Sequence, residues 1–278
     1  MTDLATAATS PAAPRADVAP PPMLSYRRPR RVKPILGLIG VVLALVTWHL
    51  LTTVGGIQET VLPAPLDVLT ALVDNRQLLM DNVGYTLRTI LVGFALSVVI
   101  GISLAVLMRA SSVVDGLLTP VIVGIQTIPK IALLPVILAW FGIGQTSGLV
   151  IVVLITVFPI LVNTRLGFSG VDDEFRSLGR VMGGSRTKTF WTIEVPLALP
   201  AIFSGLEVGM TLAVTGAAGA EMFAGSEGVA FIMQVASSSL RMDLAFAALV
   251  VLTVVGVVLY YLTTLAAWIL MPWARDRS

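Results

Sequence analysis

The chain has 278 residues, of which 56% are hydrophobic and 12% are charged, with a net charge of +2 and a pI near 9.2. This composition offers too little polar surface to cover a water-soluble globule, so it excludes a soluble protein and indicates an integral membrane protein. The absence of cysteine and the single histidine, His49, exclude disulfides, thiol catalysis and a histidine-based metal site, so neither a metal nor a cofactor is expected.

The first predicted segment is a tail, residues 1–33, which is rich in Ala, Pro and Thr and ends in a basic cluster. It lacks the apolar residues of a folded core, so we expect it to be disordered. The next stretch, residues 34–58, carries no charge and shows no small-residue cleavage pattern. It therefore predicts a retained first membrane span, about residues 35–54, rather than a cleaved signal.

Five further spans are predicted from the remaining apolar stretches. An uncharged run of about 20 residues crosses about 30 Å of hydrocarbon as a helix. A glycine-containing break at residues 142–148 divides the third span from the fourth. The predicted spans cover about residues 85–108, 117–141, 149–162, 197–223 and 244–271. The expected fold is all-α and polytopic, with six transmembrane helices in a domain of residues 34–273 and a short C-terminal tail, residues 274–278.

The positions of the basic residues predict the orientation, because cytoplasmic segments carry an excess of Lys and Arg. Of the 18 Lys and Arg residues, all but Arg76, Arg88, Arg241 and Lys130 lie on the side of the N-terminal tail. We therefore expect both termini in the cytoplasm of a plasma-membrane protein. These basic residues surround apolar spans and do not alternate with aromatics on one soluble face, so no nucleic-acid partner is expected.

A polar segment, residues 165–196, separates the fourth and fifth spans and is expected on the cytoplasmic side. Acidic residues precede apolar residues that recur at intervals of three and four positions, which predicts one short amphipathic helix. That helix contains Asp173, Glu174, Phe175, Leu178, Val181 and Met182. Gly183, Gly184 and Ser185 are predicted to end it, and a second short helix, about residues 187–194, is expected before Pro196 opens the fifth span. Such a pair of helices would form either a knob for a partner protein or an interfacial hairpin with no partner.

The polar segment resembles the "EAA loop" of ATP-binding-cassette importer permeases. That family pattern reads Glu-Ala-Ala, three residues, Gly, nine residues, Ile-x-Leu-Pro. In this chain Gly183 is followed after nine residues by Ile193-Glu194-Val195-Pro196. The positions that match Glu-Ala-Ala hold Ser177, Leu178 and Gly179, so the acidic residue is missing, and Glu174 lies one helical turn earlier as a substitute.

Further motifs resemble the nitrate, sulfonate and taurine type of these permeases, which are MetI-like, over roughly residues 62–267. They are Leu62-Pro63-Ala64-Pro65, Ile128-Pro129-Lys130-Ile131-Ala132, Trp140-Phe141-Gly142-Ile143-Gly144, Phe158-Pro159-Ile160 and Ala220-Glu221-Met222. The sequence Arg176-Ser177-Leu178-Gly179 is also similar to members linked to pyrimidine vitamin precursors.

The resemblance implies a homodimeric pore in the lipid membrane, with an ATP-binding cassette ATPase subunit beneath each copy and an extracytoplasmic substrate-binding protein on the outer face. The chain itself would not be an enzyme. The residues expected to couple it to the ATPase are Glu174, Ser177, Leu178, Gly179, Gly183, Gly184, Ser185, Ile193 and Pro196. The implied mechanism is alternating access, in which closure of the ATPases rocks the coupling helices.

Three ionisable residues, Lys130, Glu207 and Glu221, are predicted at membrane depth, where each costs at least ~2.5 kcal/mol unless it is paired or solvated. They are therefore candidates for the translocation path. Lys130 and Glu207 fall at similar depths, so we expect an ion pair between them, either structural or in contact with substrate. Glu221, near the outer end of its span, is expected to touch solvent or an outer gate.

An ion-gradient-driven secondary carrier or channel is the alternative function. It would favour inverted repeats and several acidic residues at the midplane, and only Glu207 meets that description. The transported solute is not fixed by the sequence beyond a small organic molecule or anion.

Overall fold

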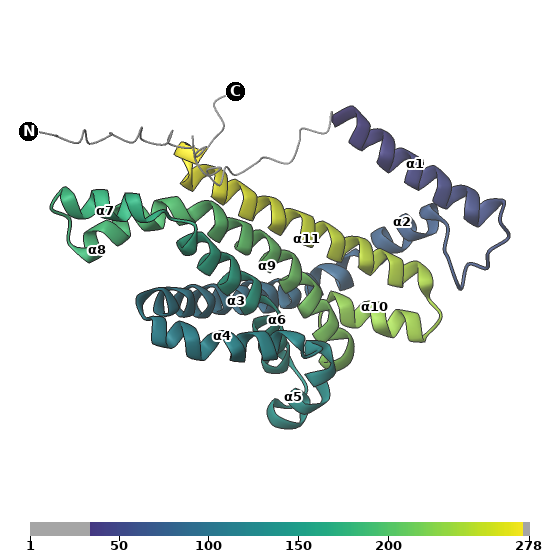
Figure 1. Cartoon of the computed structure of the whole chain (residues 1–278). Coiled ribbons are helices and arrows are strands. Elements are labelled where there is room, and N and C mark those ends of the chain that lie inside the picture. Colours follow the sequence, from purple (N-terminus) through teal and green to yellow (C-terminus); the bar gives the residue numbers. More distant parts are fainter. Residues whose placement is uncertain (1–33, 275–278) are drawn as a thin grey trace, which may run out of the picture.

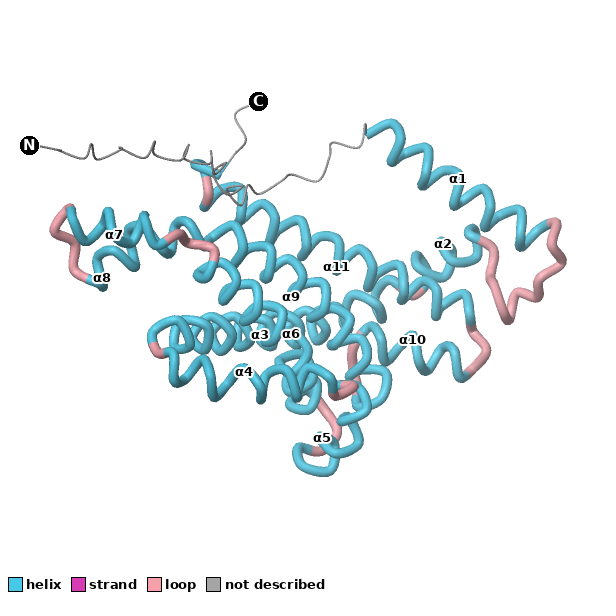
Figure 2. The backbone as a smooth tube through the Cα atoms, in the orientation of Figure 1, coloured by secondary structure: helices cyan, strands magenta, loops and turns pink. Residues whose placement is uncertain are grey.

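The structure is a computed structural model that describes residues 34–274, and these form helices and connecting loops without a strand (Figures 1 and 2). The predicted tail of residues 1–33 and most of the C-terminal tail lie outside the described residues. The helices are α1 (Pro34–Thr53), α2 (Pro65–Asp74), α3 (Arg76–Ala110), α4 (Ser112–Thr127), η1 (Lys130–Leu133), α5 (Leu134–Phe141), α6 (Gln145–Ser169), α7 (Asp173–Val181), α8 (Arg186–Thr189), η2 (Phe190–Glu194), α9 (Val195–Ala224), α10 (Val229–Ser238), α11 (Met242–Leu270) and η3 (Pro272–Ala274).

Four helical stretches of the described chain are long and apolar enough to cross a membrane. They are Arg76–Ala110, Gln145–Ser169, Arg186–Phe223 and Met242–Leu270. These coincide with the predicted second, fourth, fifth and sixth spans, and the helices are longer than the apolar runs that predicted them. Part of the predicted first span, Ile39–Thr53, is a shorter apolar helix whose side chains are mostly exposed.

The predicted third span is not one straight crossing. Helix α4 ends at Thr127, and α4 and the segment Lys130–Phe141 meet at an angle of 84°. Pro129 explains the break, because a proline lacks an N–H donor and forces the preceding residue out of the helical region. Ile128 accordingly has φ −71° and ψ 128°, and the chain resumes as the short helix η1. The bend places Lys130 at a break in the helix and not in the middle of one.

The centre of the molecule is formed by α3, α6 and α9, which pack side by side (Figure 1). Glycines allow the close approach. A Cβ added at Gly93 of α3 would lie 2.6 Å from Val152 of α6, and one at Gly205 of α9 would lie 2.7 Å from Asn163 of α6. These contacts show that the glycines let the three helices approach closely.

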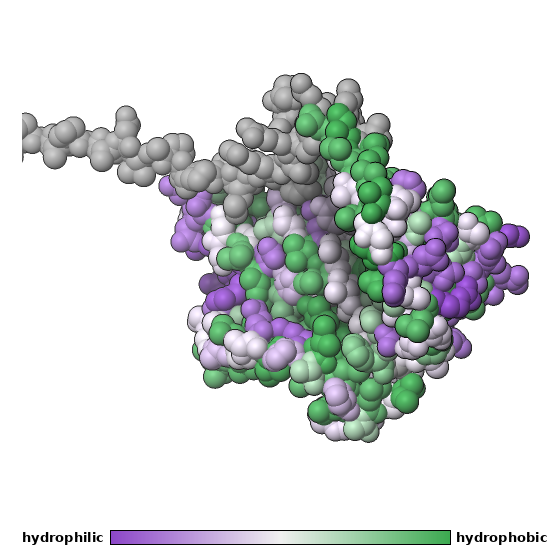
Figure 3. Space-filling view, turned by 90° about the vertical axis from the view of Figure 1, so that its right-hand side faces the viewer, coloured by the Kyte–Doolittle hydropathy of each residue, from purple (hydrophilic) through white to green (hydrophobic). Residues whose placement is uncertain are grey.

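The outer surface of the helices is apolar over large areas. Figure 3 shows hydrophobic residues spread over the face on which α1 lies, interrupted by hydrophilic patches. Helix α4 likewise has no buried residue and exposes Leu117, Val121 and Val123. Exposed apolar helix faces of this kind suit a lipid environment or contact with another membrane helix.

Candidate functional site

Helix α7 and the start of the following helix form a hairpin at one end of the molecule, residues 173–194 (Figures 1 and 2). It is called the coupling hairpin here after the role that the sequence resemblance implies for this segment. Asp173 and Glu174 occupy the first turn of α7, where carboxylates interact favourably with the helix dipole. The helix ends at Val181, as the glycines that follow it predicted.

The turn of the hairpin is closed by backbone hydrogen bonds. Gly184 N–H donates to the Gly179 carbonyl at 3.0 Å, and Gly183 N–H donates to the Arg180 carbonyl at 3.0 Å. This pair of bonds is the Schellman motif, which requires a left-handed residue after the helix. Gly183 supplies it with φ +76°, a conformation that favours glycine. The sequence signal at Gly183 therefore reflects backbone geometry.

The second half of the hairpin differs from the prediction. It begins near the expected residue, and the Ser185 side chain caps it by accepting from Lys188 N–H at 3.2 Å. However, it does not end before Pro196. It passes through the π-helical turn Phe190–Glu194 into α9, so one helix extends from Arg186 to Phe223. Because Pro196 lacks an N–H group, it cannot complete the regular bonding of the turn before it, and a wider turn is accommodated there.

The contacts of Gly179 explain one part of the departure from the Glu-Ala-Ala pattern, the glycine in place of the last alanine. It is buried, and a Cβ at this position would lie 2.8 Å from Thr189 Cγ2 and 2.9 Å from Ile193 Cδ1. The two arms of the hairpin therefore pack more closely here than alanine would allow. Glu174, Ser177 and Leu178 are exposed on α7, so they are available to a partner.

An ion-pair cluster anchors the coupling hairpin, and the sequence analysis did not identify it. Glu194 accepts from Arg109 Nε and Nη2, each at 3.1 Å, and lies 3.7 Å from Arg176 Nε. The Glu194 side chain is only 8% exposed. Arg109 is in the last turn of α3, and Arg176 is on α7, so one carboxylate connects three helices. A buried charge requires such partners, and the only sequence signal was an acidic residue at the entrance to an apolar span.

The tip of the coupling hairpin presents apolar side chains to solvent. Val181 is 85% exposed and Met182 is 78% exposed, and Leu178 and Trp191 are also exposed. Exposed apolar residues that cluster on a polar segment are typical of a protein contact surface.

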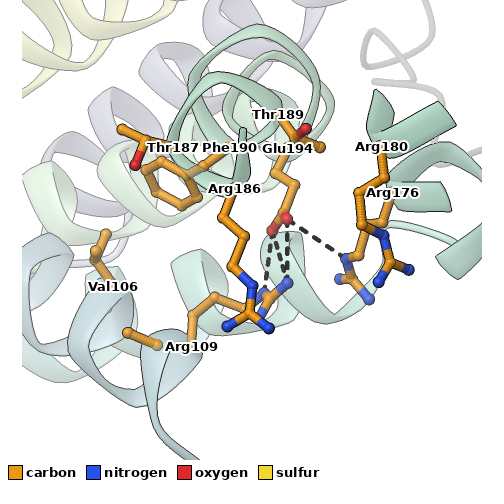
Figure 4. A pocket seen from close by; sticks show the side chains of 10 residues that line it. Val106, Arg109, Arg176, Arg180, Arg186, Thr187, Thr189, Phe190 and Glu194 are labelled. Atoms are coloured by element: carbon orange, nitrogen blue, oxygen red, sulfur yellow. Dashed lines mark hydrogen bonds and ion pairs between the residues drawn. The ribbon is translucent and has the colours of Figure 1, made fainter. Parts of the chain in front are cut away.

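A cavity of about 490 Å³ lies between the coupling hairpin and the end of α3 (Figure 4). It is lined by Val106, Arg109, Ala110, Arg176, Arg180, Arg186, Thr187, Thr189, Phe190 and Glu194. Of the residues expected to couple the chain to a partner, none lines this cavity, so it is a separate feature of the same region.

The three ionisable residues predicted at membrane depth lie away from the coupling hairpin. Lys130 Nζ donates to the Gln126 carbonyl at 2.7 Å and lies 5.7 Å from the centre of the Phe158 ring. Its pairing with Glu207 stays a prediction.

Glu221 is only 2% exposed, so of its two expected surroundings, solvent and an outer gate, solvent is wrong, and the outer gate stays a prediction. Its Oε2 atom accepts from Thr86 Oγ1 at 3.1 Å and from Ala230 N–H at 3.0 Å. Asn82 accepts from Gly228 N–H at 2.8 Å. Glu221 therefore connects α9 and α3 to the first turn of α10, where free N–H groups favour a carboxylate.

Among residues 34–274, no group of three or more acidic, histidine or cysteine side chains could hold a metal ion. The residues with distinctive geometry are those that stiffen the coupling hairpin and connect it to the spans.

Known proteins resemble this chain over most of its length. Residues 97–275 match the family model described as "Binding-protein-dependent transport system inner membrane component". The formylaminopyrimidine transport permease protein ThiX of Halalkalibacterium halodurans is 32% identical over 234 residues, covering 84% of this chain and 93% of that protein. The riboflavin transport system permease protein RibX of Chloroflexus aurantiacus is 34% identical over 248 residues, covering 86% and 91%.

The solved structures show the same fold. A structure of the MetNI methionine ABC transporter in an inward-facing conformation matches with a TM-score of 0.60 and 19% identity, covering 73% of this chain and 99% of that one. A crystal structure of an amino acid ABC transporter with histidines matches with a TM-score of 0.59 and 17% identity, covering 73% and 97%.

Proposed function

Because the chain belongs to the family of binding-protein-dependent transport system inner membrane components, the permeases of ABC importers, we propose that it works as a homodimeric pore driven by a separate ATPase. The ATPase docks on the coupling hairpin. This proposal places the hairpin and both termini in the cytoplasm of a plasma-membrane protein, in agreement with the distribution of Lys and Arg.

One observation carries the proposal: the coupling hairpin exposes an apolar tip and is rigidly connected to the spans. Val181 and Met182 are available for docking. Behind them the Gly183 turn fixes the angle between the two arms, and Glu194 ties both arms to α3. A partner that moves the tip therefore moves α9, which continues from the hairpin, and α3 together. Such rigid connection is what alternating access requires of a coupling element.

The second copy of the chain is proposed to pack around a shared pore. Helix α4 has no buried residue in a single copy, and its exposed apolar side chains suit such a contact. Lys130, Glu207 and Glu221 stay candidates for the translocation path. An extracytoplasmic binding protein would dock near the opposite end, where α10 lies.

The proposed substrate is a small nitrogen heterocycle of the vitamin-precursor kind. Formylaminopyrimidine and riboflavin permeases are about one-third identical to this chain over most of its length. The taurine transport system permease protein TauC of Escherichia coli, which is named for a small sulfonate, is 29% identical over 245 residues. Family membership also favours an ATP-driven importer over the ion-gradient carrier considered from the sequence.

The proposal is tested by retention of the ATPase on the purified permease. Met182→Asp places a charge in the apolar tip, and we expect at least tenfold less ATPase to co-purify, together with loss of uptake. Ile143→Asp is the matched control, because Ile143 is 76% exposed and lies in the loop between α5 and α6. Equal retention of the ATPase by both variants, or uptake in cells that lack the ATPase, would contradict the proposed function.

A further inference from the structure

The cavity behind the coupling hairpin is lined by four arginines that come from three helices. Arg109 comes from α3, Arg176 and Arg180 from α7, and Arg186 from α8. In Figure 4 the guanidinium groups of Arg109 and Arg186 lie below the Glu194 carboxylate, and those of Arg176 and Arg180 lie to its right. Four cations converge on a cavity of about 490 Å³, which is large enough for a small ligand.

The acidic partners nearby neutralise only two of these arginines. Glu194 pairs with Arg109 and lies 3.7 Å from Arg176, and Asp173 accepts from Arg176 at 2.6 Å. Four positive charges less two negative charges leave an excess of two. Arg180 donates to the neutral Ser177 hydroxyl at 3.2 Å, and Arg186 adds the remaining charge.

Other acidic groups of these elements are turned elsewhere. Glu174 is two residues, about 200° around the helix, from Arg176. Asp115, at the start of the neighbouring helix α4, accepts from Arg165 Nε at 2.8 Å. Among the ion pairs of residues 34–274, none neutralises Arg180 or Arg186, so the cavity keeps this excess charge and can accept an anion.

The remaining walls of the cavity are apolar and lie at the end of a span. Val106, Ala110 and Phe190 line it together with Arg109, which is in the last turn of α3. Arginines at the end of a transmembrane helix lie at the depth of lipid headgroups, and basic pockets between such helices bind anionic headgroups. The cavity thus combines a charged end with an apolar wall.

We propose that this cavity is a binding site for a phosphate group, carried by an anionic phospholipid headgroup or present as free phosphate. Guanidinium groups form paired, parallel hydrogen bonds to phosphate oxygens, and every cation that lines the cavity is an arginine rather than a lysine. The site does not depend on the transport function proposed above. A bound phosphate would connect α8 to α3 beside Glu194 and so stiffen the base of the coupling hairpin.

The test measures anion binding by the full-length chain in nanodiscs. One arm titrates inorganic phosphate into phosphatidylcholine nanodiscs by calorimetry. The other arm measures, by native mass spectrometry, the retention of phosphatidylglycerol over phosphatidylcholine. Arg186→Gln should weaken binding about fivefold, and the Arg180→Gln, Arg186→Gln double variant about 25-fold, because each basic residue near a membrane surface contributes about 1 kcal/mol.

Lys188→Gln is the matched control, since it removes the same charge two residues away, on the same helix, from a side chain that does not line the cavity. It should change binding less than twofold. Arg186→Lys keeps the charge without the planar fork, so it should fall between wild type and Arg186→Gln. Thermal unfolding of each variant in phosphatidylcholine without phosphate verifies that it is folded.

Selective retention of phosphatidylglycerol would support the site and identify the lipid, and binding of phosphate without lipid selectivity would support it and identify the free anion. Equal losses in Arg186→Gln and Lys188→Gln, or no binding of either anion by wild type, would overturn it. Unchanged anion binding by the Arg180→Gln, Arg186→Gln double variant would also overturn it. If that variant at the same time fails to retain the ATPase on purification, the cavity receives an acidic segment of that partner instead of a phosphate group.

Discussion

At the scale of single residues, the structure assigns the most connected role to a side chain that the sequence analysis left out. Glu194 stood in the sequence only as the variable position of an Ile-x-Leu-Pro pattern. Its partner Arg109 lies 85 residues away, and that separation hides the pair from any local spacing rule. Glu221 was identified because an acid in a span is costly, but its surroundings depended on α10 folding back against α3.

Glu221→Gln should loosen the start of α10. The carboxylate accepts from Thr86 and from Ala230 N–H, and an amide in its place weakens charge-assisted bonds at a helix N-terminus. We expect a loss of about 1–3 kcal/mol in the free energy of unfolding and faster amide exchange in a peptide that covers residues 228–238.

Glu227→Gln is the control for this substitution, because Glu227 is an exposed acid in the loop between α9 and α10. It should leave both the stability and the exchange rate near the wild-type values. Slow exchange at α10 in Glu221→Gln, indistinguishable from that in Glu227→Gln, would show that the buried carboxylate does not hold this helix.

At the scale of helices, the pattern of charge and hydropathy was sufficient to find the long spans and the coupling hairpin. Apolar runs located α3, α6, α9 and α11, and the Gly183 motif located the turn of the hairpin. Two features of the helices were not predicted from the sequence. The 84° bend after α4 reflects Pro129 acting within an otherwise continuous apolar run. The continuation through Glu194 into α9 reflects a π turn, which accommodates Pro196 without ending the helix.

Close packing of α6 against α9 should be sensitive to a single methyl group. Gly205→Ala places a Cβ 2.7 Å from Asn163 Cβ and 3.2 Å from the Pro159 carbonyl oxygen, and overpacking of this kind costs about 1–3 kcal/mol. Thermal unfolding of the purified variant in detergent measures the effect, which we expect as a lower midpoint.

Gly219→Ala on the same helix supplies the opposite expectation. Nothing lies within 4 Å of a Cβ at Gly219, so the substitution should stabilise the helix by up to about 1 kcal/mol. Unfolding midpoints that move in the same direction for both variants would contradict the assignment of Gly205 to a close contact.

At the scale of the whole molecule, the structure separates two ends with different tasks. The coupling hairpin and the arginine-lined cavity lie at one end of α3, and the Glu221 network with α10 lies toward the other. Helices α3 and α9 extend between them, so a displacement at the hairpin reaches α10 through rigid elements. Partner subunits could not be derived from the fold alone, since they depend on surfaces whose other half belongs to another chain.

The most direct test of this account is the side of the membrane on which the hairpin tip lies. The chain has no cysteine, so Met182→Cys introduces a single labelling site at a position that is 78% exposed. We predict that a membrane-impermeant maleimide labels this variant in inverted vesicles stripped of ATPase and does not label it in intact cells or spheroplasts. Adding the ATPase back to the inverted vesicles should block the labelling. Labelling from the outside of intact spheroplasts would place the hairpin beyond the reach of a cytoplasmic ATPase and contradict the account.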